Sequence, residues 1–350
     1  MNKTNFLPEA FGRNAAFQNL LRSTKTGKSL CVSGLFPVAK ANIINALCRA
    51  KKKTALCIAS DEREAQTLCN DLCCMGLSAL VYPLRDYNFL EEISSRSHEY
   101  EHQRLKALLK LLEGDCDVVV ACVDAACQLT VPKQVLLDTA LTLEEGREIS
   151  IDKAVRTLTL LGYERFDAVD GSGQFSLRGG ILDFFMPDSD HPVRAEFWGD
   201  EICDLSYFDL ETQRRFEKAG KIQLTPSTEI IIGDRRALAE KIIHQAGLLR
   251  GKAAAKARER LYAEAELLKG GAMLANADKF INQIYDKPAC LLDYIPRDSL
   301  LFVSEFNNVH ERGKAMDFQN SEQLKQGIAD GVLARGFDRF SLTWNECLQS

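Results

Sequence analysis

The sequence predicts an α/β protein in which a parallel-sheet domain, divided into two segments, carries an inserted α+β domain with an antiparallel sheet. Apolar runs alternate with helical patterns over residues 10–130, and short strands of alternating polarity, separated by Gly, Asp and Pro, occupy residues 175–208. A strand pattern of the buried type returns at residues 300–303. Strands alternating with helices indicate a parallel sheet, whereas short alternating strands joined by turns indicate an antiparallel one.

The composition fits an ordinary globular protein of two or three domains. The chain has 350 residues, of which 46% are hydrophobic and 27% charged, and its net charge is −5. This composition excludes a disordered, collagenous or coiled-coil chain, and no apolar run reaches the roughly 18 residues of a membrane helix. The first residues lack a hydrophobic signal core, so we expect a cytoplasmic protein. The negative charge argues against a chain dominated by a nucleic-acid-binding face.

The first part of the chain is expected to form the parallel sheet. Its predicted strands lie at residues 29–33, 54–60, 80–83 and 117–123. Its predicted helices lie at residues 40–51, 63–75 and 97–113. Asp61 precedes the second helix and is a suitable cap. The fourth strand is rich in Val and Ala, which indicates burial on both faces.

The middle of the chain is expected to form the inserted domain. Residues 131–143 are predicted to be extended, and residues 152–161 to form a helix that ends near Gly162. Four strands follow, at residues 175–178, 181–185, 193–197 and 203–208. Their alternation predicts an antiparallel meander with one solvated face.

The last part of the chain is expected to be mostly helical, with helices at residues 237–249 and 253–268. The second helix has many Lys, Arg and Glu residues at helical spacing, which indicates a solvated amphipathic face. The strand pattern at residues 300–303 predicts a return to the parallel sheet.

The twelve cysteines are expected to act mainly as small apolar residues. Most lie inside apolar runs, as Cys57 does in A-L-C-I-A. Disulfides are not expected in a reducing compartment, and the paired Cys-x2-Cys spacing of a zinc ribbon is absent from the sequence. We therefore expect no metal site at the cysteines.

A loop with the shape of a phosphate-binding loop begins at Gly34, in the segment G-L-F-P-V-A-K-A. Gly34 and Lys40 stand in the register of G-x-x-x-x-G-K-[ST]. Ala39 replaces the second glycine, Ala41 replaces the hydroxyl residue that holds magnesium, and Pro37 removes a backbone donor. We therefore expect that this loop does not bind ATP. The nearby Asp61 is better explained as a helix cap than as a magnesium ligand.

The segment H-E-Y-E-H, residues 98–102, matches the H-E-x-x-H pattern of zinc proteases. There His98 and His102 would be ligands and Glu99 the general base. The segment sits at a polar helix start, Glu101 lies between the two histidines, and no clear third ligand follows nearby. A solvated helix start is the preferred interpretation, and a zinc hydrolase is retained only as an alternative.

A run of turns and short strands from residue 173 to residue 214 carries the most specific patterns. It contains F-x-x-R-G-G-I-L-D-x-F from Phe175 to Phe185, E-F-W-G-D-E-I from Glu196, and F-D-x-E-T-Q-R from Phe208. On composition alone an ordinary hairpin is the first interpretation, although an exposed Arg beside a Phe is a good protein-binding anchor. Together with Gly162-Tyr163, these patterns resemble the second domain of the bacterial transcription-repair coupling factor family and, more distantly, UvrB.

The resemblance extends over nearly all of the chain and implies a domain organisation. It implies a degenerate helicase-like domain in the segments 1–126 and 223–350, with a UvrA-binding domain inserted at residues 127–222. Ser304 stands where UvrB has a magnesium-holding Asp, and only Glu305 remains of that pair. The module is expected to catalyse nothing and to hold no cofactor or metal. ATP and magnesium are expected only at motor domains outside these residues, because the sequence contains no helicase motif and resembles an N-terminal fragment.

The resemblance also implies a partner. Arg178 and Phe185 match residues of the UvrA-binding motif, and Arg165 is a less certain third contact. Ser176 departs from UvrB, which has another Arg at that place. UvrB's DNA-clamping β-hairpin is expected to be missing near residues 82–97. RNA polymerase and double-stranded DNA would be bound by other parts of the longer protein, and no membrane is involved. The alternative function is an ATP-binding DNA helicase or an excision-repair subunit with an active loop.

Overall fold

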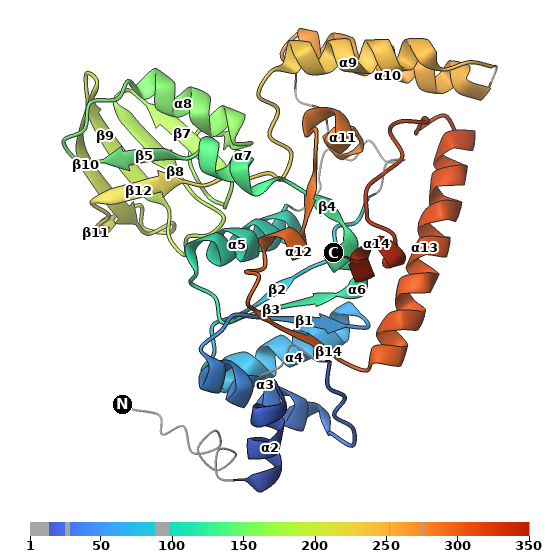
Figure 1. The fold of residues 1–350 in the computed structure, drawn as a ribbon. Coiled ribbons are helices and arrows are strands. Elements are labelled where there is room, and N and C mark those ends of the chain that lie inside the picture. The colour runs from blue at the N-terminus through green and yellow to red at the C-terminus, as the bar shows by residue number, and fades with distance from the viewer. Residues whose placement is uncertain are drawn as a thin grey trace. The chain divides into compact units, whose positions relative to one another are not determined.

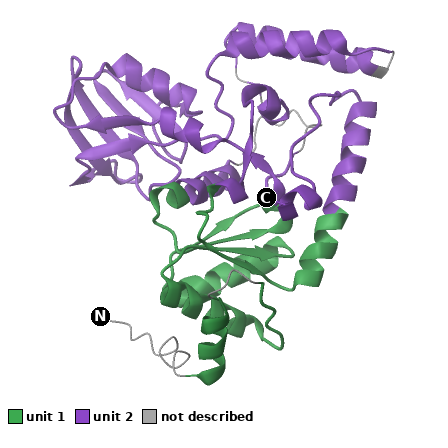
Figure 2. Cartoon of the chain, in the orientation of Figure 1, with its two compact units in different colours: residues 1–84, 110–126, 294–315 green, residues 85–109, 127–293, 316–350 purple. Residues whose placement is uncertain are grey.

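The computed structural model describes residues 14–24, 29–87, 98–251, 253–272, 274 and 276–349. The chain divides into two compact units (Figure 2). Unit 1 comprises residues 1–84, 110–126 and 294–315, and unit 2 comprises residues 85–109, 127–293 and 316–350. A parallel sheet lies in the first and an antiparallel sheet in the second, so the predicted fold class is confirmed. The predicted division into residues 1–126, 127–222 and 223–350 stays a prediction.

Unit 1 contains a four-stranded parallel sheet in the order β14-β1-β3-β2 (Figure 1). Its strands are β1 (Ala55–Ala59), β2 (Ala79–Tyr82), β3 (Val118–Cys122) and β14 (Leu300–Val303). Every residue of β1 and β3 is buried. Apart from Leu56, these two strands consist of small and β-branched residues, which pack on both faces of a parallel sheet, as the sequence predicted.

Three helices of unit 1 are α2 (Ala15–Ser23), α3 (Pro37–Lys51) and α4 (Glu62–Cys74). Buried apolar side chains of α3 and α4 form one core cluster with alternate residues of β1 and β3. Asp61 caps α4, because its Oδ1 accepts a hydrogen bond of 2.8 Å from the backbone N–H of Glu64. The predicted cap is confirmed.

Two predictions for the parallel sheet are wrong. Residues 29–33 form no strand and are exposed. The strand at residues 300–303 is not buried on both faces, because Leu301 is 65% exposed. Among the described residues β14 pairs only with β1, so it is an outer strand. A short apolar run shows that a segment can form a strand, but a strand also needs a neighbour for its backbone groups.

Unit 2 contains a six-stranded sheet in the order β11-β10-β9-β8-β7-β6 (Figure 1). Its strands are β6 (Glu164–Arg165), β7 (Gln174–Arg178), β8 (Ile181–Phe184), β9 (Val193–Trp198), β10 (Glu201–Phe208) and β11 (Arg215–Lys218). All neighbouring pairs are antiparallel except β6–β7. The four predicted strands are confirmed, and the charged strand β11 was missed because it has no apolar alternation.

The two faces of this sheet differ in polarity. One face is apolar and includes the buried side chains of Phe175, Leu182 and Ala195. The other face is polar, but Ser176 and Asp183 on it are also buried. The expectation of a simply solvated face is therefore wrong at these positions, because polar partners and a neighbouring loop cover them.

The remaining elements of the described chain are helices of various lengths and strands of two to four residues. They are α5 (Glu99–Glu113), α6 (Val123–Cys127), β4 (Leu129–Thr130), α7 (Lys133–Asp138), β5 (Leu141–Glu144), α8 (Ile151–Leu160), β12 (Lys221–Leu224), α9 (Arg235–Leu248), α10 (Ala253–Lys269), η2 (Ala277–Phe280), α11 (Ile281–Ile284), β13 (Ala289–Cys290), α12 (Leu291–Tyr294), α13 (Phe306–Ala329) and α14 (Trp344–Gln349). β5 pairs with β12, and β4 pairs with β13. None of the described helices is long and apolar enough to cross a bilayer.

The extended conformation predicted for residues 131–143 is wrong at residues 133–138, which form α7, whereas residues 141–143 lie in the strand β5. Pro132 occupies the N-cap position, and K-Q-V-L-L follows it. Lys, Gln and Leu are good helix formers, so local propensity outweighs the apolar run that suggested a strand. By contrast, α8 agrees with its prediction, with Ser150 as its cap and Gly162 at φ +87° just after its end.

Helices α9 and α10 pack against each other in unit 2 (Figure 1). Ile242 of α9 and Leu261 and Ala265 of α10 are among their buried residues. The Lys, Arg and Glu residues of α10 lie mostly outside this buried stripe. The predicted amphipathic helix with a solvated charged face is confirmed.

Seven of the twelve cysteines are buried, which agrees with their expected role as small apolar residues. Cys31, Cys73, Cys74 and Cys203 are exposed instead, and Cys347 is intermediate. Within the described part of the chain, no group of three His, Cys, Asp or Glu residues could hold a metal ion.

A buried ionic network joins distant segments of unit 2. Arg104 of α5 is fully buried, and its Nε and Nη2 donate to the Glu229 carboxylate at 2.6 and 3.2 Å. Its Nη1 donates to Gln128 at 2.9 Å, and the Thr130 hydroxyl donates to Glu229 at 2.6 Å. Because buried charges are costly unless they are paired and hydrogen-bonded, these contacts fix α5 against residues 128–130 and 229.

Glu101 extends the same network. Its carboxylate accepts hydrogen bonds from the Glu229 backbone N–H at 2.7 Å and from the Thr228 hydroxyl at 2.8 Å, and it pairs with Arg85 at 3.3 Å. Burial opposes ionisation of this carboxyl, but the Arg85 guanidinium and these hydrogen bonds hold its pKa below the ordinary range. The interpretation of H-E-Y-E-H as a solvated helix start is therefore wrong at Glu101, which lies inside unit 2.

We expect the Glu229→Gln substitution to lower the free energy of unfolding by about 3–5 kcal/mol, because it leaves the buried Arg104 without its counter-charge. Urea denaturation measures this change. The matched control is Lys325→Met, which removes an exposed ion pair with Glu322 and should change stability by less than about 0.5 kcal/mol. Equal effects of the two substitutions would contradict the assigned role of the network.

Candidate functional site

The β7–β8 hairpin carries Arg178 and leads directly into Phe185, which are two of the three predicted binding residues, and it turns through Gly179 and Gly180. Gly179 has φ +62°, a conformation that favours glycine. A Cβ atom on Gly180 would lie 2.7 Å from the backbone oxygen of Phe197, and Gly180 accepts a hydrogen bond of 2.8 Å from the Phe197 N–H. The R-G-G pattern is therefore required by a tight turn that packs against β9.

Arg178 is oriented by a buried carboxylate. Its Nη2 donates to Oδ2 of Asp183 at 2.8 Å, and Asp183 is 1% exposed while the Arg178 side chain is 51% exposed. Arg194 of β9 binds the same carboxylate through two hydrogen bonds of 2.7 and 2.8 Å. Two guanidinium groups thus share one carboxylate, so this part of the face keeps a net positive charge that Arg178 presents to solvent.

The F-D-x-E-T-Q-R segment holds Arg194 in place. The Arg194 guanidinium lies 4.5 Å from the centre of the Phe208 ring, and it donates to the Gln213 backbone oxygen at 3.1 Å. The Asp209 carboxylate accepts from the Thr212 N–H and hydroxyl, both at 2.8 Å, and so closes the turn between them. The sequence patterns that seemed separate therefore support a single surface.

Phe185 follows β8 directly and is half-buried. Its backbone N–H donates to Gln174 at 3.0 Å, so the hairpin pairing continues past the end of the strand. By strand alternation Phe185 shares the face of Asp183 and Arg178. Since Arg178 pairs with Ile181, the two predicted contacts are separated by about 13 Å along the hairpin.

Arg165 lies elsewhere on the same sheet. It is exposed on the edge strand β6, in register with Phe175. Because Phe175 belongs to the apolar face, Arg165 occupies a position on the face opposite Arg178. Ser176, which departs from the Arg that the resemblance gives to UvrB at that place, is buried and donates to the Asp167 backbone oxygen at 2.8 Å.

In unit 1, the loop at Gly34 that resembles a phosphate-binding loop is short, because helix α3 begins before Lys40. Helix α3 already begins at Pro37, and the Lys40 N–H donates to the Phe36 backbone oxygen at 3.1 Å. A phosphate-binding loop needs such N–H groups for its ligand. Ala41 is completely buried in the core, so the place of a metal-binding hydroxyl is taken by a packed methyl group.

The Lys40 ammonium contacts Ser304 and Glu305, the two residues predicted as the second half of a degenerate nucleotide site. Its Nζ lies 2.7 Å from the Glu305 carboxylate, donates to the Ser304 hydroxyl at 3.0 Å, and lies 3.6 Å from Glu64. The structure therefore brings Lys40 together with both predicted residues of the strand end. Glu305 has φ +50°, a strained conformation for a residue other than glycine.

Glu64 was missed by the sequence reasoning. It accepts a hydrogen bond from the Ser304 hydroxyl at 2.5 Å and two more from Ser60, at 3.0 Å from its N–H and 2.9 Å from its hydroxyl. Burial opposes its ionisation, but these bonds and Lys40 lower its pKa. Two carboxylates thus surround the Lys40 ammonium where a nucleotide phosphate would need it.

Asp183, Arg194 and Glu64 contribute to these arrangements without having been predicted as site residues. Asp183 had a recognisable signal, since it is a charged residue between apolar positions of a strand pattern. Arg194 lies in the same kind of position, between Val193 and Ala195, but its partners lie across a strand or in a later turn. Glu64 had no such signal, because Ser304 and Lys40 are distant from it in sequence. The expected absence of a DNA-clamping hairpin concerns residues 82–97, and residues 88–97 lie outside the described part of the chain.

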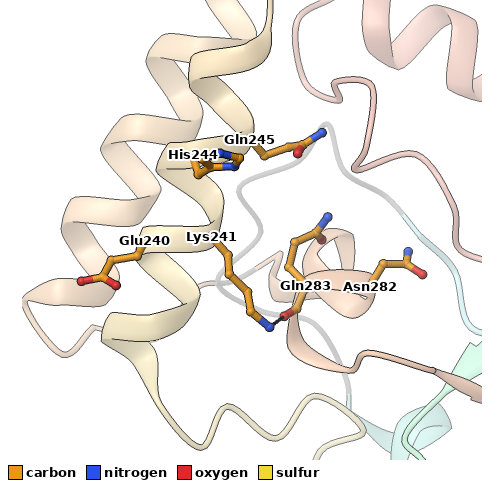
Figure 3. A pocket seen from close by; sticks show the side chains of 6 residues that line it. All are labelled: Glu240, Lys241, His244, Gln245, Asn282 and Gln283. Carbon is orange, nitrogen blue, oxygen red and sulfur yellow. Dashed lines mark hydrogen bonds between the residues drawn. The ribbon is translucent and has the colours of Figure 1, made fainter.

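A polar cavity of about 480 Å³ lies beside α9 and α11 in unit 2 (Figure 3). It is lined by Glu240, Lys241, His244, Gln245, Asn282 and Gln283. Lys241 crosses it and donates to the Gln283 backbone oxygen at 2.9 Å. None of the predicted binding residues lines this cavity.

Residues 141–230 match the family model described as the UvrB interaction domain, and this range contains Arg165, Arg178 and Phe185. These residues are therefore similar to a UvrB interaction domain, within a chain of α/β fold. Its curated relatives are transcription-repair-coupling factors. The protein of Bacillus subtilis strain 168 is 30% identical over 327 residues, which cover 91% of this chain and 28% of the relative.

Two further relatives have the same name. The Staphylococcus epidermidis RP62A protein is 27% identical over 327 residues, covering 89% of this chain and 28% of the relative. The Staphylococcus aureus Mu50 protein is 27% identical over 312 residues, which cover 86% of this chain and 26% of the relative. The resemblance expected from the sequence is confirmed. The chain spans little more than a quarter of the length of these relatives.

We expect Gly180→Ala to lower the free energy of unfolding by about 1–3 kcal/mol, because the new Cβ would press against the Phe197 backbone oxygen. Thermal and urea denaturation measure the loss. Gly233→Ala is the matched control, since a Cβ there meets nothing within 4 Å and φ is not positive, and it should be nearly neutral. An unchanged stability for Gly180→Ala would refute the tight packing assigned to the turn.

Proposed function

We propose that this chain is a non-catalytic adaptor that binds the damage-recognition protein UvrA through the polar face of its β7–β8 hairpin. Two features coincide at Arg178, and they carry the proposal. Arg178 lies within the residues that match the UvrB interaction domain, and it is a half-exposed arginine that the buried Asp183 orients. A guanidinium held in a fixed direction loses less entropy on binding than a free side chain.

The chemistry of this face suits a partner with an acidic and apolar surface. Arg178 would form charge-assisted hydrogen bonds to a carboxylate of UvrA, and Phe185 would fill an apolar pocket. Arg165, on the opposite face at the sheet edge, would contact UvrA only if the partner wraps around that edge. Arg178 and Phe185 are therefore the principal proposed contacts.

Within a longer protein, the module would recruit nucleotide excision repair to lesions where RNA polymerase has stalled. The names of the relatives support this role. The whole protein would be an ATP-dependent DNA translocase that displaces the polymerase, with RNA polymerase, double-stranded DNA, ATP and magnesium bound by domains outside this chain. We place this activity in the cytoplasm.

The proposal that the module itself lacks ATPase activity rests on the loop at Gly34. The ammonium of Lys40 is already engaged by Glu305 and Glu64, whose carboxylates would repel a triphosphate. Ala39 and Ala41 supply neither the second glycine nor the magnesium ligand. The alternative, an ATP-binding helicase or excision-repair subunit with an active loop, requires these groups to rearrange.

We expect the 350-residue chain to bind UvrA, and the Arg178→Ala variant to bind it with an affinity weaker by about 2 kcal/mol or more. Arg178→Lys should give an intermediate loss, because a lysine keeps the charge but not the planar fork. Isothermal titration calorimetry with purified UvrA measures the affinities.

The control for this experiment is Arg335→Ala, which removes an exposed arginine outside residues 141–230 and should leave the affinity unchanged. Equal affinity of wild type and Arg178→Ala would reject the assigned contact. Failure of the wild-type chain to bind UvrA would reject the adaptor function.

We also expect magnesium-ATP to leave the thermal unfolding midpoint of the chain unchanged. A ligand present at 100 times its dissociation constant would stabilise the fold by about 2.7 kcal/mol, which scanning calorimetry detects readily. A stabilisation by micromolar nucleotide that disappears in Lys40→Ala would overturn the inert-loop proposal in favour of the active one.

A further inference from the structure

Trp198 is the most exposed aromatic side chain of the interaction domain. It ends β9 and is 82% exposed, whereas the second tryptophan of the chain, Trp344, is 6% exposed. A large apolar side chain in water gains free energy when a partner covers it, and tryptophan is enriched among residues that dominate interfaces.

The backbone at Trp198 is fixed by a tight turn. Trp198 pairs with Glu201 across the two-residue turn of Gly199 and Asp200, and Gly199 has φ +62°. The indole therefore sits on a rigid hairpin and keeps only its two side-chain torsions. Covering such a side chain costs little conformational entropy.

Trp198 and Arg178 belong to the same face and the same end of the sheet. Arg178 pairs with Ile181, Ile181 pairs with Glu196, and Trp198 is two residues beyond Glu196 on the regular strand β9. The hydrogen bond from the Phe197 N–H to Gly180 ties this end of β9 to the β7–β8 turn. By strand geometry the two residues lie on the same face, two strands and two residues apart, with about 12 Å between their Cα atoms.

Charged side chains of both signs surround the two residues. Glu196 lies on the same face and forms an ion pair with Arg215. Glu201, the cross-strand partner of Trp198, is exposed on the same face, so the positive charge of this end lies at Arg178, which is left to select a carboxylate on a partner.

We propose that Trp198 is the aromatic anchor of the UvrA-binding face, and that UvrA presents an apolar socket for the indole beside a carboxylate for Arg178. This inference rests on the proposed function and adds the chemistry of the partner surface. The resemblance stated above assigned no role to this tryptophan. The socket and the carboxylate must lie within one patch of UvrA, because the two hairpins are tied together.

Titration calorimetry of the 350-residue chain with UvrA tests the proposal. Trp198→Ala should weaken binding by about 30-fold, the effect of an interface hot spot. Trp198→Phe should weaken it by less than about five-fold, because an aromatic ring still enters the socket. Phe318→Ala is the matched control, since Phe318 is 68% exposed on α13 outside the interaction domain, and it should bind normally.

A spectroscopic signal distinguishes direct contact from a structural effect. In a Trp344→Phe chain labelled with 5-hydroxytryptophan, residue 198 carries the only label. It can be excited at wavelengths that the ordinary tryptophans of UvrA do not absorb. Quenching of this signal by acrylamide should fall when UvrA binds. Thermal unfolding of Trp198→Ala should match that of wild type, because the exposed indole makes few contacts within the chain.

The outcomes separate the two proposals. Normal binding by Trp198→Ala together with weak binding by Arg178→Ala would overturn the anchor and keep the adaptor function. No binding by the wild-type chain would overturn both. Loss of self-association in Trp198→Ala, with unchanged affinity for UvrA, would assign the indole to a contact between copies and reject the proposal.

Discussion

The buried ion pair between Arg104 and Glu229 constrains how the segments of unit 2 can associate, because neither charge can be buried without the other. Arg104 is fully buried and bound to a carboxylate that lies 125 residues later in the chain. Gln128 and Thr130 complete the network from a third segment. If these segments packed in another arrangement, a buried charge would have neither an ionic partner nor water around it. The network therefore favours a single packing of the three segments.

The proposed interaction face also depends on a buried charge that is paired with partners, here near the surface. Asp183 is buried beneath two arginines, and its carboxylate determines the direction of Arg178. The tight turns at Gly179 and Gly199 add rigidity to the strands that carry Arg178 and Trp198. A surface organised in this way loses little entropy when a partner binds.

The loop at Gly34 shows how internal contacts occupy a lysine that a phosphate-binding loop would use for its ligand. The helix begins at Pro37, the Lys40 N–H is bonded to the Phe36 backbone oxygen, and the Lys40 ammonium pairs with Glu305 and Glu64. Lys40 thus joins α3 to the end of β14 and contributes to the cohesion of unit 1.

The sequence by itself determined the buried strands β1 and β3, the helices between them and the meander, because periodicity and turn residues are local signals. Its motifs also indicated the similarity to the UvrB interaction domain. It failed for residues 29–33 and for the exposed side of β14, since strand pairing depends on distant neighbours. Only the tertiary structure decided that Glu101 is buried, that Lys40 meets Glu305, and that Arg165 lies on the face opposite Arg178. Those relations arise when segments far apart in sequence become adjacent, and no local pattern encodes them.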